Sequence, residues 1–180
     1  MAEIELNMGY THYWYMEKDK EVEEEVWDNF TTDAKSLIVD NPILEEARKQ
    51  YDSDGYFGPT EIDNVKIRFD GGHETFYLER KNEQADWRKD RDWVFNFCKT
   101  ARKEYDGLVT ATLLLAKHHL GNRIRISSDG DINEWIDGAW EDVPSGYRMV
   151  QDVISEEEAH AALGKVFGED KFFLDGLRGI

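Results

Sequence analysis

The chain has 180 residues, of which 40% are hydrophobic and 13% aromatic, so a folded core is expected and wholesale disorder is not. Its formal net charge of -17 opposes contact with nucleic acid and with anionic membranes over the whole surface. A single cysteine, Cys98, rules out an intramolecular disulfide and favours a reducing compartment, predicted to be the cytoplasm. No basic-then-apolar leader or long apolar run occurs, so neither secretion nor a membrane span is expected.

The first predicted element is a strand at residues 9–16, which are rich in aromatic β-forming side chains. Both faces of this strand carry aromatic rings, so we expect both to be covered, as in a central strand. A helix follows from about residue 21 to residue 39, with acidic side chains in its first turns, where the helix dipole favours anions. Its apolar stripe comprises Val22, Val26, Phe30, Ala34 and Leu37. Pro42 fits the first turn of a second, short helix that ends near Tyr51.

Two short strands come next, at residues 65–69 and 75–79, where apolar and polar side chains alternate. A pair of glycines between them predicts a hairpin turn. Residues 80–93 are predicted as a charged loop. From Glu104 a second long helix with a wide apolar stripe runs to a glycine stop, and a strand around residues 124–126 follows it.

The order strand, helix, strand, strand, helix, strand is that of the split βαβ, or ferredoxin-like, sandwich, an α+β fold. Right-handed crossovers place the strands at 9–16 and 75–79 in the centre of one four-stranded sheet, with both long helices on one face. Residues 1–130 are predicted to form this α+β core domain, with an extra short helix. Residues 131–180 are predicted to form a C-terminal helical extension that packs on the core.

Four separated stretches of the sequence form a set, namely MGYTHYW at 8–14, GHETF at 72–76, FNFCKTARKEYD at 95–106 and RISSDG at 125–130. In this order they resemble a family of uncharacterised proteins scattered through bacteria and their phages. The resemblance covers roughly residues 8–130 and implies a cytosolic bacterial or phage setting. That family has no established activity, so the resemblance implies no catalytic residue.

One stretch gathers reactive side chains near a predicted helix entrance, with Cys98, Lys99 and Arg102 within five positions. A thiolate at Cys98 would be stabilised by the helix N-terminus and by these cations, and His12 or His73 could serve as its base. A small enzyme acting on a nucleotide or an amino-acid-like substrate is therefore the alternative hypothesis for function.

Simpler interpretations exist for the same residues. Phe95 and Phe97 flank Cys98 and suggest that its thiol is buried. Arg102 and Asp106 are four apart, a spacing that predicts an ion pair on a helix surface. A structural role is also the simpler interpretation for each histidine, although the one at position 12 would meet that at 73 if their strands were neighbours.

No metal site is predicted, because the sequence has no CxxC, HExxH or HxH pattern. The adjacent His118 and His119 point about 100° apart on a helix and do not easily share one ion. No cofactor is predicted, since the phosphate-binding GxxxxGK(S/T), the dinucleotide-binding GxGxxG and the GxSxG nucleophile motif are missing. The acidic stretch at residues 127–131 is interpreted as a turn rather than as a calcium loop.

One face of the predicted sheet combines basic and aromatic side chains, as do the stacking-plus-phosphate surfaces of single-stranded RNA binders. This face comprises Lys66, Arg68, Thr75, Tyr77, Arg123 and Arg125. The simpler interpretation is that the acidic C-terminal quarter covers it, with arginines paired to Glu156, Glu157 or Glu158. Because the global charge opposes nucleic acid, no direct nucleic-acid binding is expected.

The leading hypothesis is a non-enzymatic interaction or inhibitor protein whose acidic surface binds a protein partner with a basic surface. Its specific form is a nucleic-acid mimic, for example a phage counter-defence protein. Six tryptophans and eight tyrosines supply anchors for such an interface. A simpler interpretation is that the charge serves solubility or a salt-adapted host. The candidate binding residues are Glu21, Glu23, Glu24, Glu25, Asp28, Glu156, Glu157 and Glu158.

Overall fold

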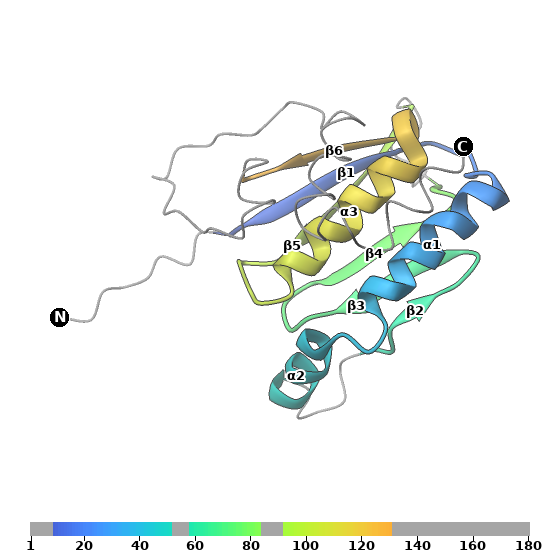
Figure 1. The fold of residues 1–180 in the computed structure, drawn as a ribbon. Coiled ribbons are helices and arrows are strands. Elements are labelled where there is room, and N and C mark those ends of the chain that lie inside the picture. The colour runs from blue at the N-terminus through green and yellow to red at the C-terminus, as the bar shows by residue number, and fades with distance from the viewer. Residues whose placement is uncertain (1–8, 52–57, 84–91, 131–180) are drawn as a thin grey trace.

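A computed structural model of the chain describes residues 9–51, 58–83 and 92–130 (Figure 1). The helices are α1 (Glu24–Ile38), α2 (Pro42–Tyr51) and α3 (Asp106–Leu120), and a 3-10 turn (Gly121–Arg123) follows α3. The strands are β1 (Thr11–Glu17), β2 (Glu61–Ile62), β3 (Lys66–Asp70), β4 (Thr75–Glu79), β5 (Trp93–Lys99) and β6 (Ile124–Ser128). The predicted extension at 131–180 lies outside the described residues, so the division into two parts stays a prediction.

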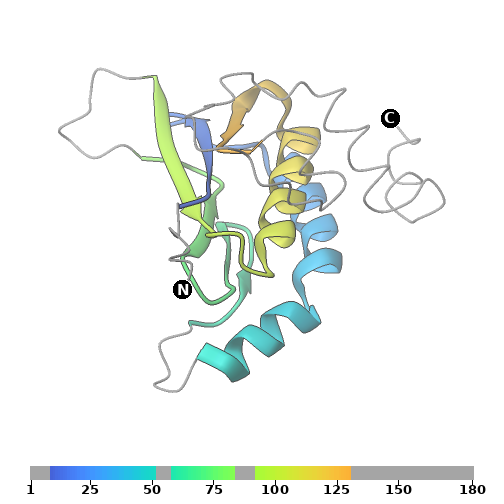
Figure 2. The ribbon, with the colours of Figure 1, turned by 90° about the vertical axis from the view of Figure 1, so that its left-hand side faces the viewer.

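The described strands form two antiparallel three-stranded sheets, with the orders β5-β1-β6 and β2-β3-β4. In Figure 1 the two long helices, α1 and α3, lie side by side across one face of the strands. The turned view in Figure 2 shows both helices on the same side, with the strands as the second layer. The α+β class predicted from the sequence is therefore confirmed.

The predicted single four-stranded sheet is not what the described strands form. Two predicted pairings are present, β1 with β6 and β3 with β4. The predicted contact between the first strand and the strand at 75–79 is reduced to a parallel bridge between Lys18 and Asn82, beyond the ends of β1 and β4. Along its length β1 pairs instead with β5, a strand that the sequence pattern did not predict. Since a strand has only two edges, β5 and β6 leave β1 no edge for β4.

Helix α3 is the centre of the core, and it is buried on nearly every side rather than along one stripe. Leu113 and Leu114 are adjacent and point in different directions, yet both are fully buried. Lys117 is buried as well, and its Nζ donates to the carbonyl oxygens of Gly121 and Ile124 at 2.9 and 3.0 Å. These bonds tie the last turn of the helix to the 3-10 turn and to β6.

The buried stripe of α1 differs in part from the predicted one. Phe30 and Ala34 are buried as predicted, whereas Val26 and Leu37 are only partly buried. Trp27 is fully buried instead, and its indole Nε1 donates to the carbonyl oxygen of Asp63 at 2.9 Å. Burying the Trp27 ring and satisfying its indole N–H stabilises the fold more than burying Val26 would, so α1 presents Trp27 rather than Val26 to the core.

A polar contact joins the two long helices. The ring Nε2 of His119 lies 2.7 Å from a carboxylate oxygen of Asp33 at the edge of the α1–α3 interface. His119 therefore lies at the border of the buried stripe, as predicted, and has a structural partner.

None of the helices in the described part of the chain is both long enough and apolar enough to cross a membrane.

Candidate functional site

The candidate residues predicted near Cys98 come together at one end of the β5-β1-β6 sheet. His12 and Cys98 are directly opposite each other in the β1–β5 register and both are fully buried. The guanidinium of Arg102 lies 4.3 Å from the ring of Tyr10, and that ring meets His12 edge-on at 5.0 Å. Lys99, the last residue of β5, is half-buried.

His73 does not join this group. It is exposed in the turn between β3 and β4, and no hydrogen bond among the described residues connects it to His12. The next residue, Glu74, contacts β5 instead. One of its carboxylate oxygens accepts a hydrogen bond from the backbone N–H of Lys99 at 2.7 Å. The condition for the two histidines to meet was that their strands be neighbours, and it is not fulfilled, since β1 and β4 belong to different sheets.

A buried hydrogen-bond network surrounds His12. Its Nδ1 lies 2.8 Å from the hydroxyl oxygen of Ser128 on β6, and its Nε2 lies 2.8 Å from Oδ1 of Asp106 at the start of α3. The hydroxyl of Thr100 donates to the same Asp106 oxygen. All four side chains are buried, so the network ties two strands, a loop and a helix together in a low-dielectric environment.

This network contains residues that the sequence pattern assigned elsewhere or missed. Asp106 was predicted to pair with Arg102 on a helix surface, but α3 begins only at Asp106, so Arg102 precedes the helix and the carboxylate turns inward. Its second oxygen, Oδ2, is buried and has no hydrogen-bond partner among the described residues. Ser128 and Thr100 carried no sequence signal, because single hydroxyl residues in a strand and a loop are common and their partners are distant in sequence.

The loop between β5 and α3 is strained. Ala101 and Arg102 have φ angles of 48° and 55°, in the left-handed region that residues with a Cβ rarely adopt. The backbone N–H groups of Thr100 and Ala101 both donate to the carbonyl oxygen of Tyr10, at 3.0 and 3.1 Å. These two bonds hold the loop against β1 and offset part of the cost of the strain.

The thiol of Cys98 is fully buried, which confirms the simpler of its two interpretations. Burial raises its pKa to about 12, and nearby carboxylates such as Glu74 add to the rise. Burial also raises the pKa of the neighbouring Tyr105 phenol. The predicted thiolate stabilisation is therefore wrong, because Cys98 lies inside β5 rather than at a helix N-terminus and desolvation disfavours its charged form.

In the folded chain, Cys98 is expected to react with iodoacetamide far more slowly than a free cysteine. The rise of its pKa from 9.0 to about 12 lowers the thiolate fraction about 1000-fold at neutral pH. The rate of alkylation, followed by mass spectrometry, is compared with that of the urea-unfolded chain. Equal rates in the two states would contradict the burial.

The same shift predicts a dependence of stability on pH. The thiol of the unfolded chain ionises near pH 9.0, whereas the buried thiol keeps its proton until about pH 12. The free energy of unfolding should therefore fall as the pH rises from 9.0 towards 12.

The predicted acidic residues of α1 divide into paired and unpaired groups. Glu21 lies 3.5 Å from Arg80, and Glu23, which precedes the helix, pairs with Arg123. The carboxylates of three exposed residues have no ion pair with any described residue. These three are Glu24, Glu25 and Asp28. The predicted residues Glu156, Glu157 and Glu158 lie outside the described part of the chain.

The residues of the basic sheet face predicted from the sequence do not lie together, since β3 and β4 belong to one sheet, Arg123 lies in the 3-10 turn and Arg125 lies on β6 of the other sheet. Lys66 and Arg68 lie on β3 in the second sheet, where Lys66 pairs with Glu61 at 3.0 Å and Arg68 donates to the Pro59 carbonyl at 2.7 Å. Arg123 lies in the 3-10 turn, paired with a glutamate. The predicted face is wrong as one surface, because its members belong to different sheets.

The side of the β5-β1-β6 sheet that points away from the helices carries a different surface, which we call the aromatic face. It comprises Tyr13, Tyr15, Trp93, Phe95, Phe97 and Arg125. Phe95 is at its centre, with ring centroids 5.9 Å from Tyr13, 5.2 Å from Tyr15 and 5.9 Å from Phe97. The guanidinium of Arg125 lies 3.9 Å from the Trp93 ring.

Phe97 on this face is 53% exposed, and the other four rings are only half-buried. The face of β1 towards the helices is therefore covered, as expected, whereas its opposite face is covered only in part. The alternation of rings in β5, at positions 93, 95 and 97, was the available signal for the aromatic face.

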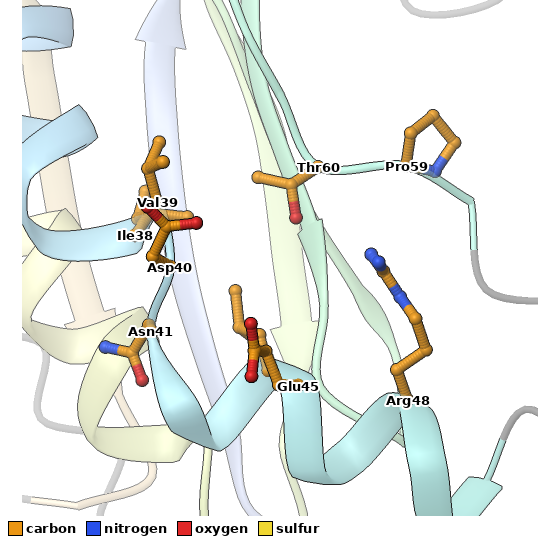
Figure 3. A pocket seen from close by; sticks show the side chains of 9 residues that line it. Ile38, Val39, Asp40, Asn41, Glu45, Arg48, Pro59 and Thr60 are labelled. Atoms are coloured by element: carbon orange, nitrogen blue, oxygen red, sulfur yellow. The ribbon is translucent and has the colours of Figure 1, made fainter.

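A pocket of about 620 Å³ lies at the far end of α1, away from the candidates above (Figure 3). It is lined by Ile38, Val39, Asp40, Asn41, Leu44, Glu45, Arg48, Pro59 and Thr60. None of the residues predicted as a site lies in it. Its members come from α1, α2 and the segment before β2, a combination that no local motif reveals.

Among the described residues, no group of three or more histidine, cysteine or carboxylate side chains is placed to hold a metal ion. No family model, curated protein or solved structure matches the chain.

Proposed function

We propose that this chain is a non-enzymatic interaction protein that binds a protein partner. The observation that carries the proposal is the aromatic face, where five rings and Arg125 form one solvent-facing surface. Aromatic and arginine side chains dominate the centres of protein interfaces, and the aromatic rings bury large area at a small cost in conformational entropy. Phe97, more than half exposed, is the natural anchor.

Charge supports the further proposal that the partner has a basic surface. The chain carries a net charge of -17, and the exposed acids Glu24, Glu25 and Asp28 at the start of α1 lack ion-pair partners among the described residues. Such a field steers a cationic partner and repels an anionic one. In its most specific form, the protein is an inhibitor that imitates nucleic acid and acts in the bacterial cytoplasm, as a protein of a bacterium or of its phage.

Capture experiments with purified basic nucleic-acid-binding proteins test this function at low and high salt. A complex released by salt is expected. Phe97→Ser should weaken it about tenfold, since a truncated anchor costs over 1 kcal/mol. Glu24→Gln combined with Glu25→Gln should weaken it about threefold at low salt, through slower association. The control is Glu46→Gln with Glu83→Gln, which removes the same formal charge from exposed positions elsewhere, where each carboxylate pairs with a lysine.

Two results would contradict the proposal. One is the absence of a salt-sensitive complex with any basic partner. The other is an equal loss of affinity in the control pair and the α1 pair, which would show that the acidity acts only as diffuse net charge.

The alternative function is a small enzyme, and the hydrogen-bond chain from Ser128 through His12 to Asp106 favours it. A hydroxyl, an imidazole and a carboxylate in this order perform nucleophilic catalysis in unrelated proteins. Against this function, His12 is fully buried and Asp106 is 1% exposed, so a substrate does not reach them in this arrangement. A thermal-shift screen with nucleotides and amino acids tests the enzyme, and a ligand whose binding is lost in Ser128→Ala would favour it.

A further inference from the structure

The pocket at the end of α1 has an apolar floor and charged walls. Ile38 and Leu44 are buried beneath it, and Val39 is 50% exposed although it is a large aliphatic residue. An exposed valine beside a cavity of about 620 Å³ is a surface that a ligand with an aliphatic group would cover.

The charged walls are held apart rather than paired with each other. Arg48 on α2 extends towards the segment that carries Pro59 and Thr60, while Asp40 and Glu45 lie nearer the α1–α2 turn (Figure 3). No ion pair joins Arg48, Asp40 or Glu45 to a described residue, although Glu45 and Arg48 have the helical spacing that favours one. One end of the pocket therefore offers a cation and the other offers carboxylates.

The framework of the pocket is fixed by other contacts. Asn41 caps α2, because its Oδ1 accepts from the backbone N–H of Ile43 at 3.0 Å, and its side-chain amide donates to the carbonyl of Leu37. On the opposite wall, Arg68 donates to the Pro59 carbonyl. Asp40 has a φ of 57°, so its left-handed backbone sets the direction of its side chain at some cost in strain.

We infer that this pocket binds a short peptide with free termini and aliphatic side chains. The peptide carboxylate pairs with Arg48, whose planar guanidinium matches a carboxylate in two hydrogen bonds. The peptide ammonium pairs with Asp40 and Glu45, and an aliphatic side chain covers Val39. The cavity is larger than one amino acid requires and suits a dipeptide or tripeptide. This site is separate from the aromatic face and from the acids of α1.

The test is a titration of the full-length chain with the dipeptide Leu-Leu, followed by amide chemical shifts in NMR. Shifts are expected at the pocket residues on α2 and in the α1–α2 turn. Leu-Leu with an acetylated N-terminus and an amidated C-terminus should bind at least about tenfold more weakly, because both ion pairs are lost.

Three variants locate the site. Arg48→Gln removes the cation, and Asp40→Asn removes a carboxylate while keeping a residue that tolerates the left-handed conformation. Each should weaken Leu-Leu binding about tenfold. Lys49→Gln is the matched control, because Lys49 is exposed, lies next to Arg48 and pairs with Glu46 outside the pocket. The inference is overturned if Leu-Leu causes no shifts at millimolar concentration, or if the blocked dipeptide or the Arg48→Gln chain binds equally well.

Discussion

Replacing His12 with alanine is expected to lower the free energy of unfolding by about 3–5 kcal/mol, because the two buried groups bonded to its ring lose a hydrogen-bond partner. The imidazole is fully buried and bridges Ser128 and Asp106, each at 2.8 Å. Without it, the Asp106 carboxylate keeps Thr100 as its side-chain hydrogen-bond donor, while its other oxygen has no partner in the described part of the chain. A cavity the size of the ring adds to the loss.

Urea denaturation followed by tryptophan fluorescence measures this effect. His73→Ala is the matched control, because His73 is exposed in a turn and its removal should change stability by less than about 0.5 kcal/mol. If the His12 variant does not fold, the milder His12→Gln keeps a polar group in place and should still lose about 1–3 kcal/mol. Equal denaturation midpoints for the His12 and His73 variants would show that the network contributes nothing to stability.

Gly71→Ala is expected to destabilise the chain by about 3 kcal/mol, at the upper end of the range for overpacking. A Cβ at Gly71 would lie 1.9 Å from Cγ of Tyr105 and 2.3 Å from its Cβ, so either the ring or the β3–β4 turn must move. The ring cannot move freely, because Tyr105 is fully buried and its hydroxyl donates to the Glu74 carbonyl at 2.9 Å. The same hydroxyl accepts from the Glu74 N–H at 3.1 Å.

The opposite result is expected at Gly107, which lies in the first turn of α3. A Cβ there meets nothing within 4 Å, and alanine favours a helix over glycine by about 0.8–1.0 kcal/mol. Gly107→Ala should therefore raise the unfolding midpoint while Gly71→Ala lowers it, and thermal unfolding by circular dichroism measures both. A Gly71→Ala chain as stable as the parent would mean that the turn is free to move away from Tyr105.

For the candidate sites, the sequence predicted groups of residues that are close in the chain better than contacts between residues that are far apart in it. Cys98 lies directly opposite His12, and Arg102 contacts the Tyr10 ring that meets His12, because a strand and its following loop carry them to the same end of the sheet. Lys99 lies opposite Thr11, so it belongs to the other face of that sheet. The roles differ, since burial keeps the Cys98 thiol protonated at neutral pH. The partners of His12 are 94 and 116 positions away in the chain, so no local pattern predicts them.

The sequence by itself determined the α+β class, the approximate positions of the three helices and the hairpin of β3 and β4. These features follow from periodicity and turn residues, which act over a few positions of the chain. The stop of α3 at Gly121 is of the same kind.

Only the tertiary structure decided which strands pair and which side chains meet. β5 pairs with β1 along its full length, although both of its faces carry apolar side chains and no alternation marks a buried side clearly. Hydrogen bonds between strands are the same for every sequence, so the choice of partner depends on packing against α1 and α3. That choice divides the strands into two sheets, turns Asp106 inward to His12 and places the aromatic face on the surface.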